Sequence, residues 1–188
     1  MLHPYLKERT TPSHQALEQR MVALIHQIRS GEDYASFLKL MYGYYAAVED
    51  RIAAFVDNRP PRDFKKRRKA DRLLSDIRQF STPGTMDLCD QLPAVHSYAG
   101  ALGAMYVLEG SVLGGKIIAR MIRSQLDTQE SPGYSFFLGY GEDTGAMWQA
   151  FKEDLEQPFN AEEKEEVVQA ANDTFVRFKQ WIDTHAKN

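Results

Sequence analysis

Residues 97–126 read SYAGALGAMYVLEGSVLGGKIIARMIRSQL, which indicates one long helix studded with glycine. Glycine costs up to about 1 kcal/mol relative to alanine inside a helix, so the glycines at 110, 114 and 115 need a structural reason. Glycines let a helix kink and let a flat ligand approach its backbone. They also let two helices pack closely through small residues. The segment Gly110-Ser111-Val112-Leu113-Gly114-Gly115 therefore predicts either a ligand-facing wall or a tight contact between helices.

The apolar stretch from Tyr98 to Gly115 has the length of a short membrane span, with Glu109 as its one charge. A carboxylate inside a span is costly, and the glycines and Ser111 dilute the hydrophobicity of the stretch. Arg120 and Arg123 follow within two turns. We therefore expect a helix buried in protein, and no association with a membrane.

Composition predicts a soluble, cytoplasmic protein of one domain over residues 1–188, and we expect a monomer. Of the 188 residues, 43% are hydrophobic, enough for one core of ordinary size but too few for two comfortable domains. The net charge of -3 argues against nucleic-acid binding. Cys89 is the single cysteine, which excludes an intramolecular disulfide and a multi-cysteine zinc site. The N-terminal residues carry no secretion signal.

The rest of the chain predicts an all-α fold, because proline and glycine recur at a spacing that suits helices and no hairpin signal occurs. Thr11 and Pro12 predict a helix start, followed by an apolar stripe that reaches Ile28. Residues 127–143 are expected to form an ordered loop whose aromatic side chains enter the core. Further helices are expected at about 33–56, 62–80, 97–126, 144–156 and 160–186, the last with a capping box of Asn160 and Glu163.

His14 lies on the predicted N-terminal helix, and Glu18 follows it by four residues, about one helical turn. A metal-ligating imidazole needs an acceptor for its other ring N–H, and a carboxylate fixes its tautomer and ring plane. The spacing alone favours a solvated histidine near a helix terminus. Combined with the glycine segment, however, it predicts a slot with an axial histidine on one wall and glycine backbone on the other.

The residues around His14 resemble those of the haem oxygenase family, especially the bacterial members that supply biliverdin to phytochromes. That family has a lysine seven residues before its proximal histidine and a glutamate four residues after it. The stretch LKERTTPSHQALE matches both spacings with Lys7, His14 and Glu18. The resemblance implies that His14 ligates iron, that Glu18 orients its ring and that Lys7 binds a haem propionate.

The distal-helix glycines of the family are matched by Gly110, Gly114 and Gly115, and the likeness continues through FFLGYG at residues 136–141. It covers nearly the whole chain except the basic segment near Lys65. The resemblance implies a multi-helix fold with haem sandwiched between a proximal and a kinked distal helix.

The resemblance also implies an oxidoreductase that opens haem to biliverdin and releases CO and iron. Haem b is then both the substrate and the oxygen-activating cofactor, while O2 and electrons from an external reductase or ferredoxin are consumed. Phe175 would contact the haem, because the family has a phenylalanine in that region. Lys152 is the nearest candidate for a second propionate anchor.

Gly110, Ser111 and Gly114 are the predicted catalytic residues. The mammalian members carry an aspartate where this chain has Ser111, so the distal water network must be organised differently. The Ser111 hydroxyl and the backbone of the two glycines would hold an ordered water that donates the proton, or approach bound oxygen. Gly115 would complete the haem-binding surface.

Lys65-Lys66-Arg67-Arg68-Lys69 is the densest run of charge. Such a run is most often a solvated helix face. It is alternatively a docking site for an acidic electron donor, because a basic patch raises the rate of encounter in a salt-dependent way. Two other functions stay open at this point: a haem carrier or sensor that leaves the ring intact, and a protein of the same fold that binds no haem.

Overall fold

The structure is a computed structural model that describes residues 1–56, 58–67, 69–127 and 133–186. The secondary structure of these residues is helical, without a strand, which confirms the predicted all-α class. The elements are α1 (Leu2–Ile25), α2 (Gly31–Val56), α3 (Phe64–Arg67), α4 (Ala70–Phe80), α5 (Tyr98–Gly110), α6 (Val112–Leu126), α7 (Ser135–Leu138), the 3-10 turn η1 (Gly141–Asp143), α8 (Thr144–Leu155) and α9 (Ala161–His185).

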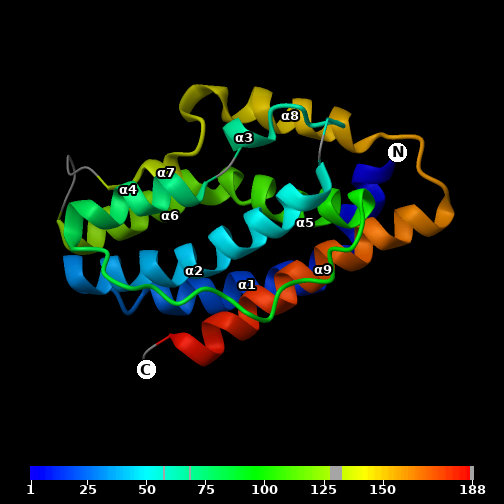
Figure 1. Cartoon of the computed structure of the whole chain (residues 1–188). Helices are drawn as coiled ribbons and strands as arrows, with labels where there is room; N and C mark the ends of the chain where they lie inside the picture. The colour runs from blue at the N-terminus through cyan, green and yellow to red at the C-terminus, as the bar shows by residue number, and fades with distance from the viewer. Residues whose placement is uncertain (57, 68, 128–132, 187–188) are drawn as a thin grey trace.

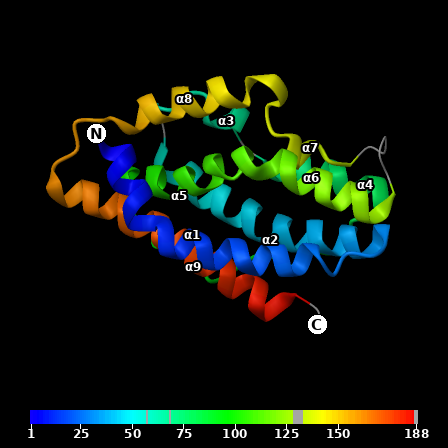
Figure 2. The same cartoon turned by 180° about the vertical axis from the view of Figure 1, so that it is seen from behind.

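The long helices lie side by side around one hydrophobic core (Figure 1). Helix α9 packs against α5 and α1, and α2 packs against α4 and α5. Figure 2 shows the opposite view, in which α1 runs beside α9 while α3 and α8 lie at the other edge of the molecule. The α5–α6 pair lies between these two edges. Helices α9 and α2 pack against α5, and α7 and α8 pack against the pair as well.

Helix α1 begins at Leu2, so the predicted start at Thr11 and Pro12 is wrong. The Glu156 carboxylate, just after α8, accepts the backbone N–H groups of Leu2 at 2.9 Å and His3 at 3.2 Å. These bonds satisfy donors that a helix start leaves free. Pro12 therefore lies inside the helix and lacks the N–H that would continue its hydrogen bonding. A cap from a distant residue overrides the local start signal.

The helix predicted over residues 62–80 is interrupted between α3 and α4, which is a second correction. The carboxylate of buried Glu49 on α2 accepts the backbone N–H groups of Lys69 and Ala70, the latter at 3.3 Å. This carboxylate caps the start of α4. Arg67 and Lys69 are buried, each 3% exposed. The predicted continuous helix is thus broken where Glu49 caps α4 and where two cations are buried.

The predicted helix over residues 97–126 divides into α5 and α6 at Ser111, as expected for a kinked distal helix. The Ser97 hydroxyl caps α5 by accepting the Gly100 N–H at 3.1 Å. A Cβ added at Gly103 would lie 2.2 Å from the Val167 carbonyl oxygen, so this glycine lets α5 approach α9. Among the described residues, Tyr98–Leu126 has the length and hydropathy of a membrane span, but 61% of its most apolar window is buried in the protein.

Two other predictions are confirmed. The capping box at the start of α9 is present, with Asn160 Oδ1 accepting the Glu163 N–H at 2.9 Å and the Glu163 carboxylate accepting the Asn160 N–H at 2.8 Å. Residues 128–132 of the predicted loop lie outside the described residues. The part that follows contains α7 and η1 and places Phe136 and Phe137 in the core, where both are buried.

Candidate functional site

A cavity of about 490 Å³ lies between α1 and the α5–α6 break. This volume is typical of sites for small molecules and cofactors. Its polar lining residues gather on α1 between His3 and Glu18, with Ser111 at the break, whereas α2, α6, α7 and α9 contribute mostly aliphatic and aromatic side chains. A cavity of this kind suits a flat, largely apolar ligand whose polar groups lie beside α1.

His14 lines the cavity from α1 and is exposed. Its ring centroid lies 5.3 Å from that of Phe175 on α9, with the two rings tilted by 55°. Within the described part of the chain, neither ring nitrogen of His14 takes part in a hydrogen bond. The imidazole therefore has one nitrogen available for a metal ion and the other for an acceptor.

Lys7 and Glu18 line the same cavity, so the three residues predicted on α1 lie at one site. Both side chains are exposed. No hydrogen bond joins Glu18 to His14 in the described structure, so the predicted orienting contact is not formed in this conformation. Phe175, the fourth residue predicted from the family, is brought to the cavity by α9.

The α5–α6 break forms the wall opposite His14. A Cβ added at Gly114 would meet no protein atom within 4 Å, and one at Gly110 would meet only Trp148, at 3.8 Å. Gly114 therefore presents bare backbone to open space, and Gly110 faces Trp148 at ordinary contact distance. A Cβ at Gly115 would lie 2.0 Å from the carbonyl oxygen of Phe137, so α7 requires this glycine. Close packing thus explains Gly115, whereas a ligand-facing role of Gly110 and Gly114 stays a prediction.

Ser111 lies at the break itself and lines the cavity. Its hydroxyl donates to the Leu108 carbonyl oxygen at 2.6 Å, which leaves the Ser111 oxygen free to accept. The buried phenol of Tyr45 on α2 is beside it. Burial raises the pKa of Tyr45, and the hydrogen bond with Ser111 opposes that rise in part. The sequence placed Tyr45 on the inner face of a helix, a pattern that does not distinguish a core residue from one that also lines a cavity.

His3 also lines the cavity, although its place near the chain end predicted a solvated side chain. Its ring lies edge-on to Trp148 of α8 at 5.8 Å and to Tyr106 of α5 at 6.1 Å. Burial lowers the pKa of His3, and the nearby charges of Lys152 and Lys7 lower it further. Lys152 influences His3 in this way but does not line the cavity. Positive and titratable groups thus gather at the start of α1.

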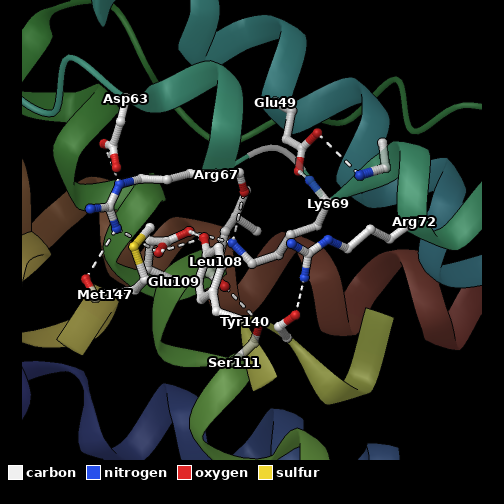
Figure 3. Close-up of polar contacts among 12 residues, drawn as sticks. Glu49, Asp63, Arg67, Lys69, Arg72, Leu108, Glu109, Ser111, Tyr140 and Met147 are labelled. Atoms are coloured by element: carbon white, nitrogen blue, oxygen red, sulfur yellow. Dashed lines mark hydrogen bonds and ion pairs between the residues drawn. The ribbon is translucent and has the colours of Figure 1, made fainter. Parts of the chain in front are cut away.

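A buried ionic cluster lies next to the α5–α6 break, centred on Glu109 (Figure 3). The Glu109 carboxylate, 2% exposed, accepts the Arg67 guanidinium at 2.9 Å and the Lys69 ammonium. The Tyr140 hydroxyl lies 3.0 and 3.1 Å from its two oxygens. Arg67 also donates to Asp63 at 2.6 Å. The pattern around Glu109 in the sequence gave no sign of this cluster, because its partners come from distant segments.

The cluster divides the basic run at residues 65–69. Lys65 and Lys66 are exposed, whereas Arg67 and Lys69 are buried against Glu109. Arg68 lies outside the described residues. The whole run is therefore neither a solvated helix face nor a continuous docking patch, because two of its cations are buried in the interior.

The model of a family described as "Heme oxygenase" matches residues 2–184 of this chain. A heme oxygenase of Xanthomonas campestris is 29% identical over 160 residues, which cover 83% of this chain and 92% of that relative. The solved heme oxygenase of Neisseria meningitidis, with NO or CO bound, superposes with a TM-score of 0.81 at 24% identity and covers 100% of this chain and 94% of its own. The structure from Synechocystis in complex with heme has a TM-score of 0.76 at 18% identity and covers 97% and 91%.

Proposed function

The chain belongs to the haem oxygenase family and is therefore a haem-degrading oxidoreductase, and we propose that it holds haem b in the α1–α6 cavity with His14 as the iron ligand. One observation carries this assignment: the free imidazole of His14 on α1 and the backbone of Gly110 and Gly114 at the α5–α6 break line the same cavity. His14 would hold the iron of a flat macrocycle bound in this cavity. The ring would also lie beside backbone that carries no side chain.

The lining of the cavity supports haem as the occupant. The ring system is flat and apolar, and the cavity walls are mainly aliphatic and aromatic. The two propionates are anions, and His3 and Lys7 line the cavity on the same stretch of α1. We place the propionates there, with Lys152 of α8 as a further positive charge close to His3.

Bound haem supplies the iron that activates O2, and the ring is opened to biliverdin with release of CO and iron. His14 would hold the iron through one ring nitrogen, and Glu18 would orient the ring by accepting the other N–H. Gly110 and Gly114 leave room for O2 and would steer it toward one meso carbon, while Gly115 fixes α6 against α7. The electrons come from an external reductase or ferredoxin.

Proton delivery on the glycine side falls to Ser111, Tyr45 and an ordered water. Because the Ser111 hydroxyl proton is used by the Leu108 carbonyl, the Ser111 oxygen acts as an acceptor there. Burial raises the pKa of Tyr45, which keeps its phenol protonated at neutral pH. A water held by these groups would transfer a proton without placing a carboxylic acid beside the oxygen.

The test is a titration of the purified protein with haemin. The unchanged protein should give a sharp Soret band of a histidine-ligated haem, which His14→Ala should weaken. His26→Ala is the matched control, because His26 lies at the end of the same helix, is exposed and does not line the cavity. Absence of a band in the unchanged protein would contradict haem binding.

Ring opening is tested in the same cuvette by adding ascorbate or a reductase. The Soret band should fall as the absorbance of biliverdin rises. A stable complex with O2 and no biliverdin would instead favour the haem carrier or sensor. This second result separates binding from catalysis, because both proteins would pass the titration.

We further propose a monomeric, cytoplasmic, single-domain enzyme that supplies biliverdin to a phytochrome, as its resemblance to the phytochrome-associated bacterial members suggests. An acidic electron donor would dock on Lys65 and Lys66, the exposed cations of the basic run. Reversal of both charges should slow ferredoxin-driven turnover at low salt and leave ascorbate-driven turnover unchanged. Equal rates with ferredoxin would exclude docking at this place.

A further inference from the structure

The backbone at Gly110 and Gly114 lines the cavity without side chains. A Cβ would meet nothing within 4 Å at Gly114 and only Trp148, at 3.8 Å, at Gly110, so neither position is closely packed. Glycine also has more backbone freedom than any other residue. The distance between this wall and a ligand must therefore be set by the residues that flank the two glycines. On the α6 side, the contact of Gly115 with the Phe137 carbonyl supplies such a fixed point.

On the α5 side the flanking residue is Glu109, which directly precedes Gly110. Its carboxylate is bound by three groups from two separate parts of the chain. They are Arg67 at the end of α3, Lys69 before α4 and Tyr140 between α7 and η1, and Figure 3 shows them converging on it. Arg67 is held in turn by Asp63 and by the Met147 carbonyl oxygen, at 3.2 Å.

We infer that Glu109 is a positioning residue that sets the height of the Gly110–Gly114 wall above the haem. The inference rests on the proposed function, because the height of the wall matters only when haem occupies the slot. Glu109 does not line the cavity, so it acts through the adjoining backbone rather than on the substrate. A shift of about 1 Å in such a wall changes reaction rates by up to about a hundredfold.

The charge of Glu109 is essential to this role. An anionic carboxylate can accept from a guanidinium, an ammonium and a phenol together, whereas a glutamine has one acceptor oxygen and presents its NH2 group to a cation. Burial and the charge of Glu109 raise the pKa of Tyr140, which keeps that phenol a donor. Removing the charge would leave Arg67 and Lys69 buried with less compensation, and the segments that they tie to α5 would move.

The test compares Glu109→Gln with the unchanged protein in its complex with ferric haem. Azide must fit between the iron and the distal wall, so its affinity reports the height of that wall without any turnover. We expect Glu109→Gln to change azide affinity by about fivefold or more and to broaden the pattern of biliverdin isomers, because a loosened wall no longer directs attack to one meso carbon. Haem affinity itself should stay close to that of the unchanged protein.

Asp173→Asn is the matched control. The Asp173 carboxylate accepts the Ala94 N–H at 2.7 Å, so it also ties a helix to a remote segment, but it neither lines the cavity nor touches the break. It should lower stability without moving azide affinity or the isomer pattern. A Glu109→Gln protein that behaves like Asp173→Asn in both readouts would overturn the inference.

If Glu109→Gln does not fold, the Tyr140→Phe variant tests the inference instead. It removes only the hydroxyl that contacts Glu109, and it should shift both readouts in the same direction by a smaller factor. Unchanged azide affinity and isomers in Tyr140→Phe would then count against the inference. Failure of the proposed function is a different result, because the unchanged protein would then fail to bind or open haem.

Discussion

The two walls of the slot are built in opposite ways. On the α1 wall, the residues proposed to bind haem are the exposed side chains of His14, Lys7 and Glu18. On the α5–α6 wall, the proposed ligand contacts are made by backbone, and the inferred support of that backbone is a buried group outside the slot, Glu109. Substitutions on the α1 wall should therefore weaken haem binding without changing the stability of the fold. Substitutions that affect the α5–α6 wall should change both haem binding and stability.

A matched pair of lysines gives the largest expected contrast. Lys69→Met removes a buried partner of Glu109 and should lower the free energy of unfolding by about 3 kcal/mol, because an uncompensated buried charge is costly. Lys7→Met changes an exposed side chain and should alter stability by no more than about 0.5 kcal/mol while weakening haem binding. Urea unfolding monitored by circular dichroism checks the first effect and haemin titration the second. Equal stabilities would show that the cluster does not hold the wall.

Neighbouring glycines provide the next contrast. Gly115→Ala places a Cβ against the Phe137 carbonyl and should destabilise the protein by about 1–3 kcal/mol. Gly114→Ala points into open space and should stabilise the helix by about 0.5–1 kcal/mol while reducing ring opening, because the methyl group faces the ligand. Melting temperature and biliverdin yield, measured on both variants, test the pair. A destabilised Gly114→Ala protein would contradict the open wall.

The same contrast explains what could be predicted from the sequence. His14 and Glu18 share the predicted helix, so their spacing alone brings them together. Lys7 precedes the predicted helix start, and only the family resemblance connected it with them. The break near Ser111 was foreseen because glycines are costly inside a helix. The burial of Arg67 and Lys69 was not foreseen, since their partner Glu109 lies about 40 residues away and the local pattern is that of a solvated helix.

Helix starts were missed for the same physical reason. Thr11 and Pro12 form a strong local start signal, yet α1 begins at Leu2 because Glu156, far along the chain, caps it. That early start is also what brings His3 to the cavity. Local patterns therefore identified the residues of the α1 wall, whereas long-range contacts decided where the helix begins and what holds the opposite wall.

Glu18 gives a smaller, purely functional effect on the α1 wall. Glu18→Gln should leave the free energy of unfolding unchanged, because the side chain is exposed. It should reduce haem affinity or turnover by about tenfold, since a carboxylate that orients a ligating imidazole typically contributes that much. The haem complex should also show a weaker iron–imidazole bond by resonance Raman spectroscopy. A normal Raman band together with normal turnover would remove Glu18 from the site.

His3 provides the smallest effect, which is a pH dependence. Its pKa in the free protein is lowered by burial, Lys152 and Lys7, so the ring is neutral at pH 7. Propionates bound beside it would raise that pKa, and binding would then take up a proton. Because binding takes up a proton on His3, haem affinity should increase as the pH falls through the pKa that His3 has in the complex.

The measurement that isolates this contribution is the ratio of haem affinities of the unchanged protein and His3→Gln at several pH values. Other pH-dependent steps of binding are common to both proteins, so they cancel in the ratio. The ratio should rise by about two- to threefold between pH 7.5 and pH 5.5, because His3 is partly exposed and solvent screens its charge. A ratio that does not change with pH would place the propionates away from His3. The start of α1 would then line the slot without binding the propionates.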